Sequence, residues 1–146
     1  MTTLQLKRNI GHRLLLGHPW VYANEVARVK GDLKGGDLAD VFTHEGKFLG
    51  RGYANPKSQI LVRLLTKDPR ETIDESFFRR RIEAAWKYRQ QLGYLENCRL
   101  IFGEADFLPQ LIIDKFNDYF VLQTLALGID VWKPTFVKVL EQLFSP

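Results

Sequence analysis

Residues 46–66 read GKFLGRGYANPKSQILVRLLT, and this stretch decides the fold. Two runs of β-type sequence, 47–53 and 59–65, flank the segment ANPKS at residues 54–58. Proline fixes its own backbone, and asparagine and serine bond their own backbones, so this segment is a turn. The second run is apolar on both faces apart from two polar residues, which is typical of a central strand. The pair therefore predicts the middle of a small basic β-barrel.

The size and composition of the chain limit what it can be. Its 146 residues, 45% of them hydrophobic, suffice for one domain or two small ones with packed cores. No apolar run approaches the roughly twenty residues of a membrane span, and the N-terminus is no signal peptide. Cys98 is the only cysteine, which excludes an internal disulfide and a cysteine-based zinc site. We therefore expect a cytoplasmic protein without a membrane partner or a bound metal; no oligomeric state is indicated.

Positive charge is concentrated in the first half of the chain. Residues 1–67 contain eleven Lys or Arg and five Asp or Glu, a net charge of +6. Residues 68–146 contain ten and twelve, a net charge of −2, which together with the first half gives the overall +4. A basic surface favours a polyanionic partner, although such an excess also serves solubility alone.

Further short strands are expected around the central pair. Residues 4–7 and 37–42 alternate apolar and polar side chains, and Gly46 suits a hairpin turn. Asn9 as N-cap and Gly17 as terminator predict a short helix over residues 10–16. With an apolar cluster at 20–26 and a turn at 30–36, this makes four or five strands, as in a small barrel.

A composition change at residues 67–70 marks a boundary. Thr72 and Glu75 have the spacing of a capping box for a helix that Gly93 would end. We expect the apolar stripe of this helix to be buried, in particular Phe78, Ile82 and Trp86.

The last part of the chain predicts a small α/β unit. Residues 99–103 have strand character, and 111–116 and 119–125 form a hairpin around Asn117-Asp118. A final helix begins at about Asp130, and its apolar stripe has no evident partner. The fold class is therefore α+β, with a barrel over 1–68, a connecting helix over 69–95 and the α/β unit over 96–146.

Several segments resemble known families. Residues 17–26 (GHPWVYANEV), 36–41 (GDLADV), 52–56 (GYANP) and 58–63 (SQILVR) resemble a PUA domain, a pattern shared by many RNA-modifying proteins. Residues 103–114 (GEADFLPQLIID) resemble the central segment of the S-adenosylmethionine-dependent methyltransferases that make 5-methylcytosine in large-subunit ribosomal RNA. The resemblance covers nearly the whole chain and implies ribosomal RNA as the partner.

The resemblance also has two departures. That family usually has glycine where Phe107 and Gln110 stand here, and a Cβ would alter the tight backbone path that glycine implies. Nothing resembles the family's cofactor loop or cysteine nucleophile. We therefore expect the N-terminal part of a longer protein, in which this chain alone has no catalytic residues and binds no S-adenosylmethionine, whereas the full-length enzyme uses it.

Seven residues are candidates for RNA contact. Lys7, Arg8, His12 and Arg13 lie on a surface that the resemblance places near the RNA-binding face. Arg51, Lys57 and Arg63 lie on or beside the central strands. Lys57 is the best of these three because it is on a loop, whereas a buried arginine such as Arg63 is equally well explained by an ion pair. A solvated cationic surface explains the first four equally well.

Other conspicuous residues have structural explanations. His18 lacks a triad and is expected to pack or hydrogen-bond, and Trp20 and Trp86 are expected in cores. Glu104, Asp106 and Asp114 are expected in structural or interdomain roles, and Cys98 as an inert thiol.

Three functions remain open. The first is the RNA-binding portion of a ribosomal RNA cytosine methyltransferase. The second is a stand-alone RNA-binding adaptor, and the third is a protein-interaction domain whose basic face only confers solubility.

Overall fold

The computed structural model describes residues 1–145, which divide into two compact units. The first unit spans Met1–Glu71 and the second begins at Thr72. Within the described residues the first unit holds a six-stranded sheet and the second a three-stranded sheet, with no strand pairing between them. Each unit is therefore built around its own sheet.

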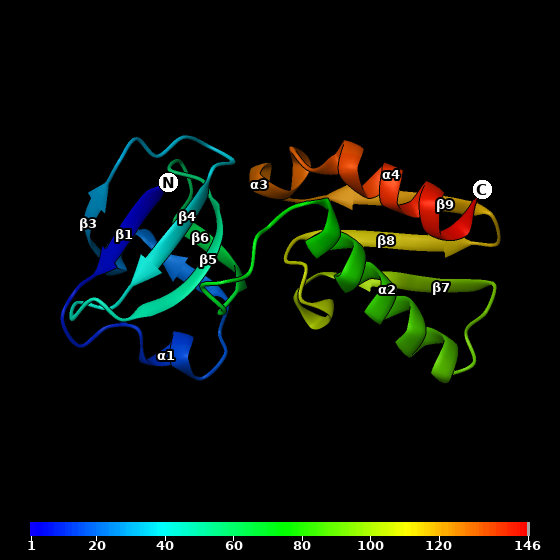
Figure 1. Cartoon of the computed structure of the whole chain (residues 1–146), viewed down its shortest axis with the longest axis horizontal. Coiled ribbons are helices and arrows are strands. Elements are labelled where there is room, and N and C mark those ends of the chain that lie inside the picture. Colours follow the sequence, from blue (N-terminus) through cyan, green and yellow to red (C-terminus); the bar gives the residue numbers. More distant parts are fainter. Residues whose placement is uncertain (146) are drawn as a thin grey trace. The chain divides into compact units, whose positions relative to one another are not determined.

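The first unit is a curled six-stranded sheet (Figure 1). Its elements are β1 (Thr2–Leu6), α1 (His12–Leu15), β2 (Trp20–Tyr22), η1 (Ala23–Glu25), β3 (Val26–Lys30), β4 (Leu38–Phe42), β5 (Phe48–Ala54) and β6 (Ile60–Thr66). The strand order is β2-β6-β5-β4-β1-β3, in which only β1 and β4 pair in parallel among the described strands. The predicted central position of the second run is confirmed, because β6 lies between β2 and β5.

The core of the first unit follows the alternation of its strands. Leu4 and Leu6 of β1, Val21 of β2 and Val41 of β4 are fully buried. Their polar neighbours on the same strands point away from this core. The alternating patterns in the sequence therefore place the apolar face of the sheet inside the curl.

The short helix differs from its prediction. Asn9 is not its N-cap but a turn residue with φ 62°, and α1 begins only at His12, after Gly11. Gly17 has φ 107° and follows the last turn, which confirms its predicted role. Asn9 was misassigned because asparagine suits both an N-cap and a left-handed turn.

A sixth strand, β3, was not predicted. Its first residue, Val26, ends the apolar cluster at 20–26, and its last residue, Lys30, begins the turn expected at 30–36. The strand is exposed over most of its length and pairs only with β1. An exposed edge strand has no buried stripe, so its sequence carries little of the signal used for the other strands.

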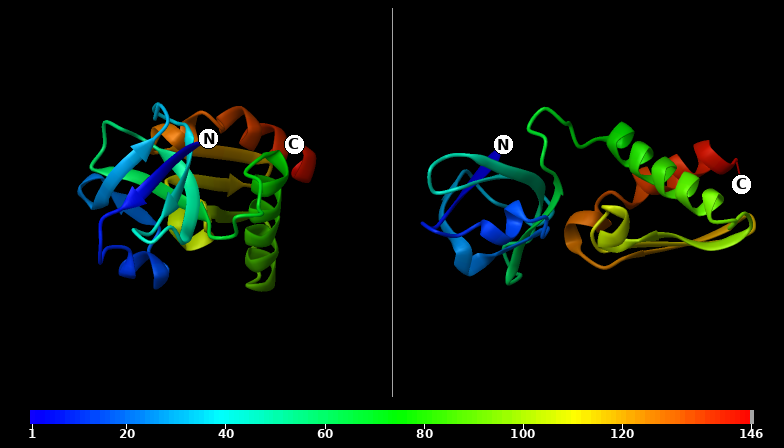
Figure 2. Two further views of the ribbon diagram at one scale, coloured as in Figure 1. Left: turned by 60° about the vertical axis from the view of Figure 1, so that its left-hand side comes forward. Right: turned by 90° about the horizontal axis from the view of Figure 1, so that it is seen from below.

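The second unit packs two helices against a three-stranded antiparallel sheet. Its elements are α2 (Glu75–Gln91), β7 (Asn97–Phe102), η2 (Gly103–Asp106), β8 (Leu111–Phe116), β9 (Tyr119–Thr124), α3 (Leu127–Asp130) and α4 (Lys133–Phe144). The strand order is β7-β8-β9, and α2 and α4 lie on the same side of the sheet (Figure 2). As predicted, β8 and β9 form a hairpin whose turn contains Asn117 at φ 53°.

Helix α2 belongs to the second unit instead of connecting two units. It packs against α4 and β7, with Phe78 and Ile82 fully buried and Trp86 half-buried. Its N-cap is Asp74, whose carboxylate accepts a hydrogen bond from the Phe77 amide at 2.9 Å, so the expected Thr72 capping box is wrong.

The apolar stripe of α4 is covered, contrary to expectation. The Phe136 ring lies 5.0 Å from that of Phe78, and the Phe144 ring lies 5.3 Å from Trp86 and 4.9 Å from Phe120. The sequence of the helix alone does not show this packing, because the partners come from α2 and β9. Among residues 1–145, no helix is long and apolar enough to cross a membrane.

Candidate nucleic-acid interface

Most acidic side chains of the first unit are already engaged. Glu25 pairs with Arg13, Asp40 with Arg51 and Asp32 with Lys34. The Asp37 carboxylate accepts the Lys34 backbone amide. These pairings divide the cations of the unit into those held by internal contacts and those left for a ligand.

Arg13 is held by internal contacts. Its guanidinium donates to Glu25 Oε1 at 2.7 Å and lies 2.8 Å from His18 Nδ1. The same group lies over the Tyr22 ring at 5.0 Å and donates to the Trp20 carbonyl at 3.3 Å. Arg13 therefore ties α1 to the segment around β2 and η1.

The hydrogen-bonding role expected for His18 is confirmed. Its Nδ1 accepts the backbone amide of Trp20 at 3.2 Å, in addition to the contact with Arg13. Both partners are obligate donors, so Nδ1 must act as an acceptor and the ring proton belongs on Nε2.

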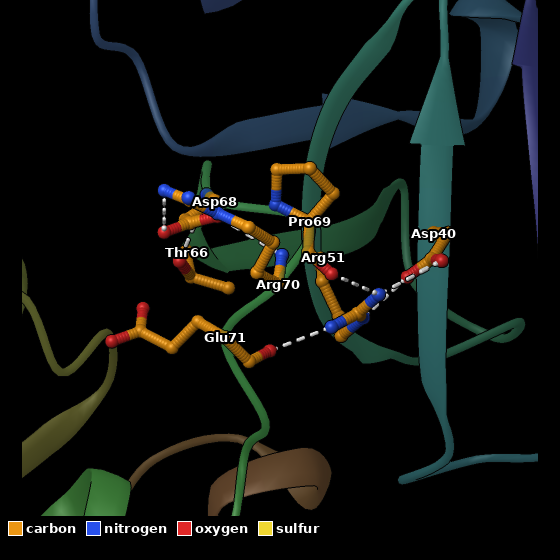
Figure 3. Close-up of polar contacts among 7 residues, drawn as sticks. All are labelled: Asp40, Arg51, Thr66, Asp68, Pro69, Arg70 and Glu71. Atoms are coloured by element: carbon orange, nitrogen blue, oxygen red, sulfur yellow. Dashed lines mark hydrogen bonds and ion pairs between the residues drawn. The ribbon is translucent and has the colours of Figure 1, made fainter.

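Arg51 is held in the same way (Figure 3). Its Nε and Nη2 donate to the two carboxylate oxygens of Asp40 at 2.6 and 3.2 Å. Its Nη1 donates to the Glu71 carbonyl at 2.6 Å, and Nη2 also reaches the Pro69 carbonyl at 3.4 Å. The hydrogen bond to Asp40 raises the pKa of Arg51, whose side chain is only 14% exposed. The guanidinium therefore fastens residues 69–71 to β4 and β5.

Arg63 has no ion pair within the described residues, so the salt bridge considered for it is not found there. Its guanidinium instead lies 5.1 Å from the centre of the Trp20 ring, the residue opposite it in the β2–β6 pair. Arg63 Nη1 and Trp20 Nε1 are both buried without a hydrogen-bond acceptor among the residues described. Both donors are therefore left unsatisfied among the described residues, which costs stability.

The remaining cations make no side-chain hydrogen bond or ion pair among residues 1–145. They are exposed, and they comprise Lys7, Arg8, Arg28, Lys30, Lys47 and Lys57; the side chain of His12 is also exposed and makes no such contact. Their freedom makes them the cations available to an anionic partner.

Sheet topology separates these free cations. Because β1 and β4 are parallel, the turns that follow them, with Lys7 and Arg8 after β1 and Lys47 after β4, lie at one end of the sheet. The side chain of Gln5 donates to the His44 carbonyl at 2.6 Å and joins the two turns. We call this the basic end of the sheet. Lys57 follows β5, which runs antiparallel to β4, and so lies at the opposite end.

Helix α1 adds His12 next to the basic end. The Lys67 ammonium, which follows β6, donates to the Leu14 carbonyl of α1 at 2.8 Å. Strand β6 runs antiparallel to β5 and therefore finishes at the same end as β4. Lys47 was not among the predicted residues, because only the pairing of β1 with β4 places it at the same end of the sheet as Lys7.

The carboxylates singled out in the second unit all have partners. Asp106 binds Arg89, Asp114 binds Arg99, and the Glu104 carboxylate accepts the Gln110 side-chain amide at 3.0 Å. Burial raises the pKa of the Cys98 thiol, which is opposite to what a nucleophile needs. Within residues 1–145, no three His, Cys, Asp or Glu side chains gather as metal ligands would.

The two residues that stand in place of glycine keep a glycine-like backbone. Phe107 has φ 61° and Gln110 has φ 65°, both in the left-handed region. The backbone between Asp106 and Leu111 therefore takes left-handed conformations that glycine favours, and it places two Cβ atoms where they are disfavoured.

Comparison with known proteins agrees with this architecture. Residues 4–67 match the model of a PUA-like domain. The chain is 42% identical over 134 residues to ribosomal RNA large subunit methyltransferase I of Cronobacter sakazakii and of Escherichia coli. The Klebsiella pneumoniae protein of the same name is 41% identical. Each alignment covers 90% of this chain and 34% of the relative, so the chain spans about a third of their length.

Solved structures show the same fold at low sequence identity. A putative SAM-dependent methyltransferase from Streptococcus mutans superposes with a TM-score of 0.82 at 13% identity, over 99% of this chain and 38% of that chain. A putative methyltransferase solved in complex with SAH superposes equally well. The chain is therefore homologous to the N-terminal region of ribosomal RNA large subunit methyltransferase I, and residues 4–67 form a PUA-like domain.

Proposed function

We propose that this chain is the RNA-binding portion of a S-adenosylmethionine-dependent ribosomal RNA (cytosine-5) methyltransferase. The observation that carries the proposal is the 42% identity over 134 residues with an enzyme whose name states its ribosomal RNA substrate. The free cations of the PUA-like unit supply the matching chemistry, because phosphate contacts dominate the affinity of proteins for nucleic acids. This role implies a cytoplasmic location.

The basic end of the first sheet is the RNA-binding surface in this proposal. Lys7, Arg8 and Lys47 contact phosphates there, and His12 lies beside them on α1. Arg63 Nη1 and Trp20 Nε1 are buried, so neither donor is counted among the phosphate contacts. Lys57 makes a separate contact at the opposite end.

Arg13 and Arg51 support this surface without touching RNA. Arg13 fixes α1, which carries His12. Arg51 fixes the segment that leaves the sheet after β6. Both guanidinium groups already bind a carboxylate, so a phosphate would have to compete with an internal partner.

S-adenosylmethionine would supply the methyl group in the whole enzyme, but the described residues of this chain do not fit it. Cofactors of this kind bind where a glycine-rich loop joins a parallel strand to a helix N-terminus. In residues 1–145 the parallel strands are β1 and β4; β1 leads to the four-residue α1, and β4 leads directly to β5. The proposal therefore assigns RNA binding to this chain and no part in holding the cofactor.

The test is the salt dependence of binding to a ribosomal RNA fragment. Each phosphate contact to a single strand contributes roughly 0.7 to the slope of log affinity against log salt concentration. The double variant Lys7→Gln/Arg8→Gln should therefore lower the slope by about 1.4. The matched control, Lys87→Gln/Lys133→Gln, removes the same charge from exposed positions of the second unit and should leave the slope unchanged.

Two outcomes would overturn the proposal. One is a parent chain that binds the RNA fragment no better than a neutral protein of similar size does. The other is an equal loss of slope in both double variants, because binding would then depend on net charge alone and not on the basic end.

A further inference from the structure

A cavity of about 220 Å³ opens on the first unit beside the edge strand β3. It is lined by Thr3, Leu4, Gln5, Arg28, Lys30, Phe42 and Gly46. These residues come from β1, β3, β4 and the turn after β4, three strands that are neighbours in the sheet (Figure 1). The cavity is smaller than the roughly 300–1,000 Å³ of pockets for drug-sized molecules, which restricts its occupant to a group of about one ring system.

Two free cations share one wall of the cavity. Arg28 lies opposite Gln5, and Lys30 opposite Thr3, in the antiparallel β1–β3 pair, so these side chains share one face of the sheet. Leu4 and Leu6 occupy the core face, which leaves the cations on the outer face. Both cations are exposed and make no ion pair among residues 1–145.

An aromatic ring forms the other wall. Phe42 lies opposite Gln5 in the parallel β1–β4 pair and is half-buried. Its ring contacts the Phe48 ring edge-to-face at 5.7 Å between centroids, which fixes its orientation. The bond from Gln5 to the His44 carbonyl holds the turn that bounds the cavity.

Negative charge around the cavity is limited. Asp40, on the same strand as Phe42, is already bound by Arg51. Glu45 is exposed in the bounding turn, next to the free cation Lys47. The cavity therefore combines an apolar ring surface with an excess of positive charge.

We propose that this cavity holds one unpaired nucleotide of an RNA strand, with its base against Phe42 and its flanking phosphates on Arg28 and Lys30. An aromatic face together with cations is the combination by which proteins hold single-stranded nucleic acid. The inference rests on the proposed function and deepens it, because the turn that bounds the cavity also carries Lys47 of the basic end. It adds a third strand, β3, to the RNA-binding surface.

The two walls are tested separately in the whole chain, with a labelled single-stranded RNA oligonucleotide as the probe. Arg28→Gln/Lys30→Gln should lower the salt slope by about 1.4, the contribution of two phosphate contacts. Phe42→Leu should weaken binding roughly five-fold or more with the salt slope unchanged, because base stacking is lost. Phe42→Tyr keeps the ring and should bind like the parent.

Control measurements distinguish a failure of the cavity inference from a failure of the proposed function. An RNA duplex should be insensitive to Phe42→Leu, because its bases are not free to enter the cavity. If Lys7→Gln/Arg8→Gln lowers the slope but the variants at Arg28, Lys30 and Phe42 bind like the parent, the cavity inference is wrong and the proposed function stands. A parent chain that binds no RNA overturns both. Equal weakening by Phe42→Leu and Phe42→Tyr would overturn the stacking role.

Discussion

Arg89 and Asp106 form a bidentate ion pair inside the second unit. The guanidinium Nη1 and Nη2 of Arg89 on α2 donate to the two carboxylate oxygens of Asp106 at 2.6 and 2.7 Å. The Asp106 carboxylate also accepts the Phe102 amide at 2.7 Å, and Arg89 Nε donates to the Arg99 carbonyl. The hydrogen bond to Asp106 raises the pKa of Arg89. This pair fixes α2 to the turn after β7.

We predict that Asp106→Ala lowers the free energy of unfolding of the second unit by about 3 kcal/mol, because the buried Arg89 charge loses its partner. The two side chains are only 13% and 10% exposed, so water replaces the lost partner poorly. NMR signals followed through a urea titration report each unit separately. The control Asp118→Ala, at an exposed hairpin position, should change the free energy by less than about 0.5 kcal/mol.

Arg51 provides a second test, which separates support of the fold from contact with RNA. Arg51→Lys keeps the positive charge but loses the fork that reaches Asp40 and the two carbonyls of residues 69 and 71. We expect the first unit to lose about 2 kcal/mol of stability while the salt slope of RNA binding stays that of the parent. A lower slope with unchanged stability would show that Arg51 contacts phosphate.

Local signals in the sequence predicted the local structure. The Asn117 turn, the glycines that end α1 and α2, and the central position of β6 follow from residues close together in the chain. The pairing of β1 with β4 could not be predicted in this way, since the two strands are more than thirty residues apart. The positions of Lys7 and Lys47 at one end of the sheet depend on that pairing.

The sequence identifies candidate RNA-binding residues by their type, but it does not show which of them are free to contact a ligand. Lys7, Arg8, His12, Arg13, Arg51, Lys57 and Arg63 are all basic residues of the first half, and the sequence does not show which of them has an acidic partner. The structure does, because Glu25 and Asp40 are brought beside two of these cations. Opposite charges that are far apart in the sequence meet only in the folded structure. The structure is therefore needed to tell the cations that have an acidic partner from those that do not.

Glycine at position 52 allows the two central strands to approach each other. A Cβ there would lie 2.6 Å from the Arg63 carbonyl carbon and 2.7 Å from the Leu64 Cα, both backbone atoms that cannot move aside. We expect Gly52→Ala to cost the first unit more than about 3 kcal/mol. Gly50→Ala should cost less in the same urea experiment, because its closest neighbours are the flexible end of the Leu64 side chain and the Thr66 carbonyl oxygen, both at 2.9 Å and so farther away than the backbone atoms that face position 52. An equal cost for both would show that β5 and β6 can separate freely.

The Cys98 thiol should react slowly at neutral pH. Burial raises its pKa despite the opposing positive charges of Arg89 and Lys115, so less of it is the reactive thiolate at pH 7. Its alkylation by iodoacetamide, followed by mass spectrometry, should be slower than in the urea-unfolded chain. The rate should still be rising with pH above the ordinary cysteine pKa of about 8.5. A rate already at its plateau at pH 7 would mean a lowered pKa.

The backbone between Asp106 and Leu111 gives the last prediction. Phe107 has a positive φ that costs an ordinary residue about 1–2 kcal/mol and glycine much less. Its side chain is 68% exposed and contacts the Arg81 guanidinium at 5.7 Å, so its removal costs little packing. Comparison of Phe107→Gly with Phe107→Ala removes the ring in both variants and isolates the backbone.

We expect Phe107→Gly to be more stable than Phe107→Ala by about 1 kcal/mol. Glycine gains because it adopts the left-handed conformation without strain, and it loses part of that gain because its unfolded chain is more flexible. Gln110→Gly and Gln110→Ala should differ by a similar amount, since both lose the bond to Glu104. Thermal unfolding of the four variants measures both differences. If alanine equals glycine at both positions, the left-handed backbone carries no strain, and glycine offers no advantage where Phe107 and Gln110 stand.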